Sequence, residues 1–160
     1  SPLIETEFEG NYLKKPKLPD ILVKDKFFIS LAIAKTHYLT SITGIIKNLF
    51  GLLPKKGKKI YHTDINNIIT DLCRFIQPDL CIIDARVGIE GWNGPKTRNI
   101  DRFIIGTKPL STDAIMARIM GFEPGNIQHL AQAAKYNLGS LNPKVVGEEV
   151  ETSKVQFSPP

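Results

Sequence analysis

The sequence predicts an α/β fold with a mainly parallel sheet of short buried strands and helices packed on it. Three short apolar runs, at 27–34, 80–83 and 102–106, are typical of buried strands. Segments with helical spacing of apolar residues alternate with these runs, and such alternation favours parallel strands. The 160 residues are 42% hydrophobic and 23% charged, which is the composition of one globular domain.

The first half of the chain begins with an extended lead-in at 1–19, which contains three prolines and is a candidate for one edge strand. After the strand at 27–34, Thr40 or Ser41 can cap a helix, which Pro54 ends. The apolar stripe of this helix supports the prediction, because its members recur at helical spacing: Ile42, Ile45, Ile46, Leu49 and Leu53.

The second half continues the alternation. Thr63 caps a helix that ends before Pro78, and the strand at 80–83 follows and ends at Asp84. A glycine-rich loop at 85–101 leads to the strand at 102–106. Two further helices, from Ser111 or Thr112 to Gly121 and from 126 to 137, and weak strands at 145–146 and 155–157, complete the prediction. We therefore expect one domain at 20–150 and a C-terminal tail at 151–160.

Charge is distributed unevenly along the chain. The net charge is +5, and residues 1–62 hold eleven lysines against five acidic residues, a net of +6. The run of Lys55, Lys56, Lys58 and Lys59 contributes most to this excess. An anionic partner fits this charge. A nucleic-acid partner is not expected, because the run lacks interleaved aromatics and any nucleic-acid motif, so a solvated loop is the favoured interpretation.

The cysteine count and the hydropathy pattern exclude several classes of protein. Cys73 and Cys81 are too few for a disulfide framework, and no CxxC pair suggests zinc. Their placement on a helix and in a strand indicates small buried hydrophobic residues. No apolar run approaches the roughly 18 residues of a membrane span. We expect a cytoplasmic protein without a membrane partner.

Polar residues follow each predicted strand, where ligands bind in open α/β sheets. Lys35, Thr36 and His37 follow the first, and the second is followed by a group of acidic and glycine residues, Asp84, Glu90, Gly91 and Gly94. Lysines can hold an anion, histidine can transfer a proton, and carboxylates can bind a metal or act as a base. Each residue also has a structural interpretation, as a polar strand exit or a turn cap.

Two further candidates lie on predicted helices. Lys47 and Asn48 lie on a stripe of small and polar residues on the first helix, which can bind an anion or serve helix packing. Asp113 lies in the first turn of a later helix, where a carboxylate favours the helix dipole whether or not it binds a ligand.

An ordered set of motifs supports a family resemblance. The set comprises Lys35-Thr36-His37, Lys47-Asn48-Leu49-Phe50-Gly51, Asp79 with Asp84, Glu90-Gly91, Gly94-Pro95, Asp113 and Met120-Gly121. It resembles the archaeal and bacterial family known as domain of unknown function 362, across about residues 20–150. Family members usually carry an earlier strand–helix portion with a Lys-Pro-Asn motif. That portion is absent here, and with a start at Ser1 the resemblance implies a fragment of a longer prokaryotic protein.

The resemblance also implies a redox association, because ferredoxin-type iron–sulfur modules are attached to this domain in some members. This chain has no cysteine cluster, so any iron–sulfur cluster would belong to another segment or partner. We expect an enzyme or redox-linked subunit that binds a small anionic ligand, with a divalent metal as a further candidate. His37, Asp84 and Glu90 would be catalytic, and the ligand would contact Lys35, Thr36, Lys47, Asn48, Gly91, Gly94 and Asp113. The alternative is a non-catalytic module that uses the lysine run to bind an acidic protein or nucleic acid.

Overall fold

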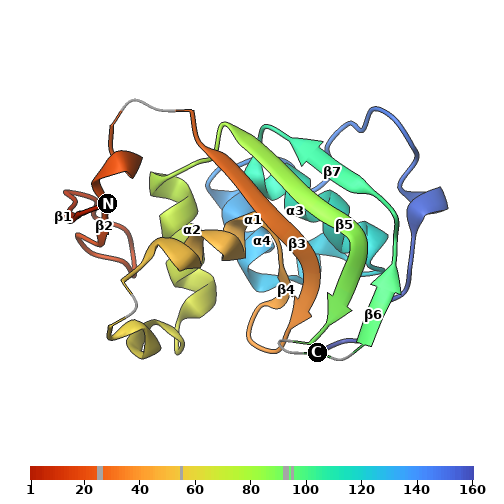
Figure 1. The fold of residues 1–160 in the computed structure, drawn as a ribbon, viewed down its shortest axis with the longest axis horizontal. Helices are drawn as coiled ribbons and strands as arrows, with labels where there is room; N and C mark the ends of the chain where they lie inside the picture. Colours follow the sequence, from red (N-terminus) through yellow and green to blue (C-terminus); the bar gives the residue numbers. More distant parts are fainter. Residues whose placement is uncertain (25–26, 55, 92–93, 95) are drawn as a thin grey trace.

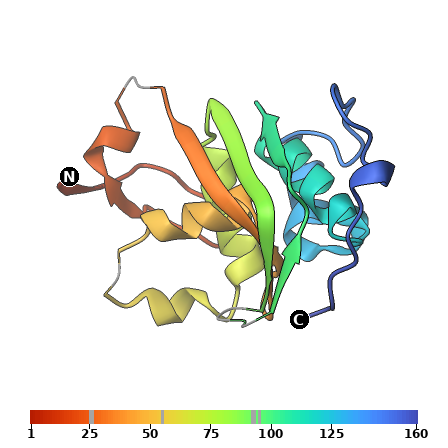
Figure 2. The same ribbon diagram turned by 45° about the vertical axis from the view of Figure 1, so that its right-hand side comes forward.

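The computed structural model describes residues 1–24, 27–54, 56–91, 94 and 96–160. A twisted sheet lies in front of the helices in Figure 1, and Figure 2 shows α3 (Pro109–Ile119) and α4 (Gln128–Lys135) on one side of it. The sheet strands are β3 (Ile29–His37), β4 (Ser41–Thr43), β5 (Leu80–Glu90), β6 (Lys96–Asn99) and β7 (Phe103–Gly106).

The sheet is mixed, so the prediction of a mainly parallel sheet is wrong. Among the described strands, only β3 and β5 pair in parallel, whereas β4 pairs antiparallel with β3, and β6 and β7 both pair antiparallel with β5. The physical reason is connection length. Only the connection from β4 to β5, which contains α1 (Ile45–Asn48) and α2 (Ile65–Phe75), is long enough for a parallel crossover, and short turns return the chain antiparallel.

The sheet has one covered face and one open face. Along β3, buried Ser30, Ala32 and Ala34 alternate with exposed Ile29, Leu31 and Ile33. Helices α1 and α3 pack on the buried side, where Ile83 of β5 and Ile104 of β7 lie in the same row as Ala32. The hydrophobic core therefore lies between the sheet and these helices.

Several predicted elements have different bounds. The predicted helix from Thr40 to Leu53 is a short strand β4, the one-turn helix α1 and a 3-10 turn η2 (Leu49–Leu52). The reason is that β3 runs on to His37, and a tight turn with Ser41 at a φ of 61° then reverses the chain. Likewise β5 continues past Asp84 to Glu90, and part of the predicted loop at 85–101 is strand β6. The weak strands predicted at 145–146 and 155–157 do not form.

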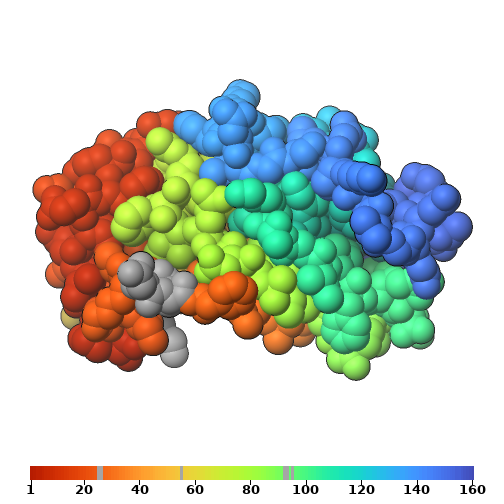
Figure 3. All heavy atoms as spheres, turned by 90° about the horizontal axis from the view of Figure 1, so that it is seen from above, coloured from red at the N-terminus to blue at the C-terminus, as the bar shows by residue number. Residues whose placement is uncertain are grey.

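The two terminal segments pack at opposite ends of the molecule (Figure 3). The lead-in forms a hairpin of β1 (Leu3–Glu5) and β2 (Lys17–Pro19), and the backbone N–H groups of Tyr12 and Leu13 donate to the Asp71 carboxylate of α2 at 2.7 and 3.0 Å. At the other end Phe157 is fully buried, and its N–H donates to the carbonyl of Met120 at 3.0 Å. Both segments are thus part of the packed structure.

Four further 3-10 turns connect these elements: η1 (Asp20–Leu22), η3 (Lys58–Tyr61), η4 (Pro124–Asn126) and η5 (Glu151–Ser153). Within the part of the chain that the structure describes, no helix is long and apolar enough to cross a membrane.

Candidate anion-binding site

The ends of β3 and β5 meet at one edge of the sheet, as the sequence predicts for parallel neighbours. The Gly91 N–H donates a hydrogen bond of 2.7 Å to Oγ1 of Thr36, which is buried. Gly91 has a φ of +85°, and a Cβ on Gly94 would overlap the carbonyl of Glu90. These glycines are therefore needed for a tight turn at the end of β5. Trp92, Asn93 and Pro95 lie outside the described residues.

Five basic residues gather beside the end of β3, and we call them the basic cluster: Lys35, His37, Lys47, Lys58 and His62. They come from β3, α1, η3 and the residue after η3. Lys47, Lys35 and His62 all lower the pKa of His37, and Lys35 and Lys58 lower the pKa of Lys47. These five side chains are thus close enough to repel one another when charged.

His37 is buried and neutral at pH 7. Burial, and after it the charges of Lys47, Lys35 and His62, lowers its pKa from 6.5 to about 4. The Leu39 N–H donates to Nδ1 of the ring at 3.2 Å, so the single proton of the neutral ring lies on Nε2. His37 therefore offers a hydrogen-bond donor at Nε2 without adding a charge.

Lys47 is a cation of the cluster whose pKa is strongly lowered. Burial, followed by the charges of Lys35 and Lys58, lowers its pKa from 10.5 to about 8. Its ammonium lies 4.9 Å from the centre of the Phe50 ring, as does that of Lys58, and the His62 ring stacks on the same phenyl at 5.6 Å. Phe50 thus holds two ammonium groups near each other, which cation–π attraction favours.

Lys35 and Lys47 lack an acidic partner within the described part of the chain. Among the residues that the structure describes, no carboxylate contributes to the pKa of His37 or Lys47. Unpaired, partly buried cations are unfavourable in a protein without a ligand. The arrangement is therefore typical of a site that is completed by an anion.

Asp113 and Asn48 serve the fold in this structure. The buried Asp113 carboxylate accepts hydrogen bonds from the N–H groups of Ile45 and Ile46 at 2.6 and 2.9 Å, and so caps the start of α1 from α3. Burial raises the pKa of this carboxyl to about 7. The Asn48 amide donates to Oγ of Ser30 and to the carbonyl of Leu31, which fixes α1 to the beginning of β3.

The two predicted catalytic carboxylates, Asp84 and Glu90, form their hydrogen bonds with residues outside the basic cluster. Asp84 lies in the middle of β5, not at its end, and Arg86 donates to both of its oxygens at 3.1 and 2.7 Å. Glu90 does lie at the end of β5, where Arg98 and the Ser158 N–H both donate to its Oε1 and lower its pKa. The structure does not bring either carboxylate into the basic cluster.

The site also includes Phe50 and Lys58, which the sequence does not indicate as site residues. Lys58 belongs to the lysine run at 55–59, which was expected to be a solvated loop; Lys56 and Lys59 are exposed, and Lys55 lies outside the described residues. A local signal for Lys58 is absent, because its place depends on how η3 folds back onto η2. His129 is fully buried, and neither of its ring nitrogens has a hydrogen-bond partner among the described residues.

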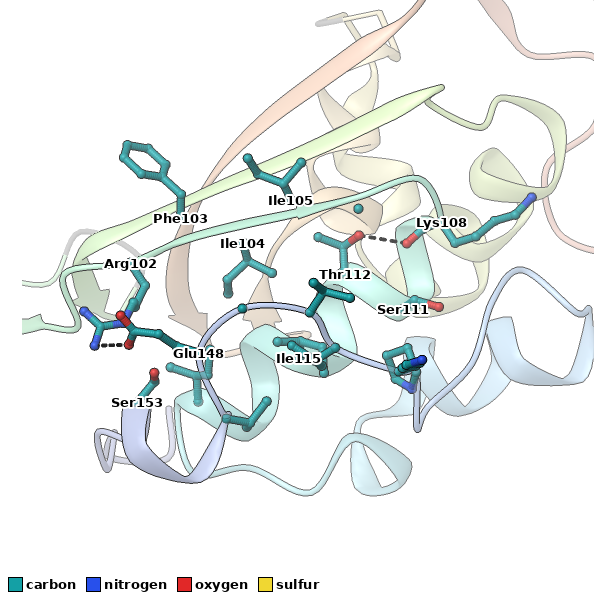
Figure 4. A pocket seen from close by; sticks show the side chains of 18 of the residues that line it. Arg102, Phe103, Ile104, Ile105, Lys108, Ser111, Thr112, Ile115, Glu148 and Ser153 are labelled. Atoms are coloured by element: carbon teal, nitrogen blue, oxygen red, sulfur yellow. Dashed lines mark hydrogen bonds and ion pairs between the residues drawn. The ribbon is translucent and has the colours of Figure 1, made fainter.

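A separate cavity of about 580 Å³ lies between β7, α3 and the segment at 143–148 (Figure 4). Arg102 and Glu148 form an ion pair at one end of it, and Lys108 and Ser111 lie at the other. None of the basic cluster lines this cavity. In the described ranges, no group of three or more His, Cys, Asp or Glu side chains is placed to hold a metal ion.

The fold and this site define a mixed α/β domain with a basic cluster beside the end of a central strand. Residues 1–118 match the family described as domain of unknown function (DUF362), and the chain belongs to this family. It is also similar to the thylakoid-associated protein sll1697 of Synechocystis sp. (strain PCC 6803), at 30% identity over 125 residues. That alignment covers 72% of this chain and 38% of the relative. No solved structure shows a significant match.

Proposed function

We propose that this domain binds a small anion, with a phosphate or carboxylate group, at the basic cluster. The observation that carries the proposal is Lys47, which is partly buried near Lys35 and Lys58 with its pKa lowered to about 8. A bound anion would offset the repulsion among these charges and replace part of the water that burial removes.

Each residue of the cluster has a distinct part in this proposal. Lys35 and Lys47 supply positive charge, and Lys58 of η3 adds a third cation to the cluster. The Nε2–H of His37 donates a neutral hydrogen bond to an oxygen of the anion, and it is the group that would transfer a proton if the bound ligand reacts. Gly91 and Gly94 shape the neighbouring strand end rather than contribute charge.

The test is a thermal-shift titration with inorganic phosphate, pyrophosphate and citrate, with sodium chloride matched for ionic strength. A ligand at about 100 times its Kd adds roughly 2.7 kcal/mol of stability, which raises the Tm of a domain this size by about 5–10 °C. Lys47→Met should abolish the shift, whereas Lys135→Met, on the exposed end of α4, should retain it. An equal shift in both variants, or none in the wild type, would contradict the proposal.

A second candidate is a module that binds an acidic protein through the lysine run. The observation in its favour is the exposure of Lys56 and Lys59 at the surface. Surface charges bind with a steep dependence on salt, because counterions are released or screened. Binding to an acidic polypeptide such as polyglutamate that is lost in Lys56→Gln/Lys59→Gln but kept in Lys47→Met would favour this candidate over the first.

Four more specific expectations from the sequence remain predictions. They are a catalytic role for His37, Asp84 or Glu90, a divalent metal, a cytoplasmic location, and an iron–sulfur module in a longer polypeptide. The chain spans 38% of the relative's length, and the relative is named for its association with thylakoids.

A further inference from the structure

The open face of the sheet has rows of apolar side chains across β3, β5 and β7. Pairing places Leu31, Ile82 and Ile105 in one row across β3, β5 and β7, and the next row contains Ile33, Asp84 and Phe103. With Ile29 at the start of β3, these rows form what we call the open apolar face: Ile29, Leu31, Ile33, Ile82, Phe103 and Ile105. Figure 4 shows Phe103 and Ile105 pointing away from the helices, opposite to Ile104.

The exposure of this face is large for an isolated domain. Leu31, Phe103 and Ile105 are 64%, 54% and 65% exposed, and Ile29 and Ile33 are each 51% exposed. Half-exposed side chains of this size contribute on the order of 100 Å² each, so the face presents roughly 500–600 Å², the upper end for the largest patch of a monomer. Moreover, strands that pair in parallel, as β3 and β5 do, are normally covered on both faces.

The charges on this face are already paired. Asp84 and Arg86 neutralise each other through two hydrogen bonds, and the Arg86 guanidinium lies 4.9 Å from the centre of the Phe103 ring. Lys35, at the end of β3, is the charged residue that borders the face near the basic cluster. The face thus has no unbalanced charge at its centre, and it is complementary to another neutral apolar surface rather than to a charged one.

We propose that the open apolar face is a homodimer interface, in which two copies of this chain pack sheet against sheet. Two such faces bury roughly 1,000–1,200 Å², which is close to the lower limit for a specific interface. Aligned sheets pack with the side chains of both inner faces interdigitated, and rows of isoleucine, leucine and phenylalanine suit this arrangement. Pairing through strand edges is less favourable, since the outer strands β4, β6 and β7 have only three or four residues each.

The experiment is sedimentation equilibrium or light scattering of the 160-residue chain, from 1 to 200 µM, with two variants on the face, Leu31→Lys and Ile105→Lys. A two-fold interface contains each substitution twice, so a tenfold loss per copy raises the dimer Kd about 100-fold. Both variants should therefore be monomers at concentrations where the wild type is a dimer. Circular dichroism and Tm establish that each variant is folded.

The matched control is Ile60→Lys, which changes an equally exposed isoleucine on η3, 72% exposed and outside the face. It should dimerise like the wild type. A wild-type chain that is monomeric at 200 µM overturns the proposal and assigns the face to a different partner, such as another segment of a longer polypeptide. Dimers that survive both face substitutions, or dissociate with Ile60→Lys, also overturn it, because the interface then lies elsewhere.

Discussion

Replacement of Lys47 by methionine is expected to make the ligand-free protein more stable. The lowered pKa of Lys47, about 8 instead of 10.5, means that its charged form is disfavoured in the fold. At about 1.4 kcal/mol per pKa unit this amounts to about 3 kcal/mol, and solvent screening of a partly exposed ammonium reduces it to about 1–2 kcal/mol. Methionine retains the apolar stem and removes the charge.

One favourable contact is lost in this variant, so the net gain is smaller. The cation–π contact between Lys47 and Phe50 contributes about 0.5–1 kcal/mol. We therefore expect a net gain of about 0.5–1.5 kcal/mol in the free energy of unfolding at pH 7, or about 1–5 °C in Tm. Urea unfolding in a buffer without phosphate or carboxylate ions measures it, with Lys135→Met as the control that should change little.

The pH dependence gives the same prediction a second readout. Because the pKa of Lys47 is lowered on folding, the cost of its charge is fully present below about pH 8 and disappears as pH rises toward 10.5. The advantage of Lys47→Met over the wild type should shrink over that interval. A variant that is less stable than the wild type at pH 7, or an advantage that grows with pH, would refute this reasoning.

Three further predictions concern the supports of the site. Asp113→Asn should lower the free energy of unfolding by about 1–3 kcal/mol in urea, because the amide can cap only one of the two N–H groups at the start of α1. Gly44→Ala should lower the free energy of unfolding by about 1–3 kcal/mol, since its Cβ would overlap the Asp113 carboxylate. Gly51→Ala, with nothing near its Cβ, should be nearly neutral. Equal effects of the two substitutions in thermal melts would argue against this packing. The pKa of His37 is lowered on folding, so protonation of its ring destabilises the fold as pH falls from 6.5 toward 4. The Tm should therefore fall less between pH 7.5 and pH 5 in His37→Gln than in the wild type. His129, whose pKa is also lowered, destabilises both proteins in the same direction as pH falls.

The sequence predicts the apolar elements better than their pairing. The strand starting near residue 27, the helix α2 and the helix α3 follow from local patterns of apolar residues and breakers. The direction of pairing does not, because it depends on how tightly the turns after His37 and Glu90 reverse the chain. Those turns require positive φ at Ser41 and Gly91, and only the glycine indicates this locally.

The residues of the candidate site also differ in how well the local sequence predicts their positions. Lys35, Thr36 and His37 are adjacent in sequence, and their place at a strand end is predictable from the apolar run before them. Lys47 was singled out for its position on a helix, although α1 is a single turn.

The capping role of Asp113 is not predictable from the sequence, for a different reason. Its partners Ile45 and Ile46 are 68 and 67 residues away along the chain, so its capping role appears only when α3 packs beside α1. Lys58 joins the cluster through its contact with Phe50, which lies eight residues earlier in the chain.

The central claim is that an anion completes the basic cluster, and the titration of the His37 ring measured by NMR tests it most directly. Without a binding anion, the His37 pKa should be near 4, because burial and the charges of Lys47 and Lys35 oppose protonation. Saturating pyrophosphate should raise it by about one unit or more, since a bound anion counteracts both cations. A His37 pKa that is the same with and without pyrophosphate, at matched ionic strength, would contradict the account.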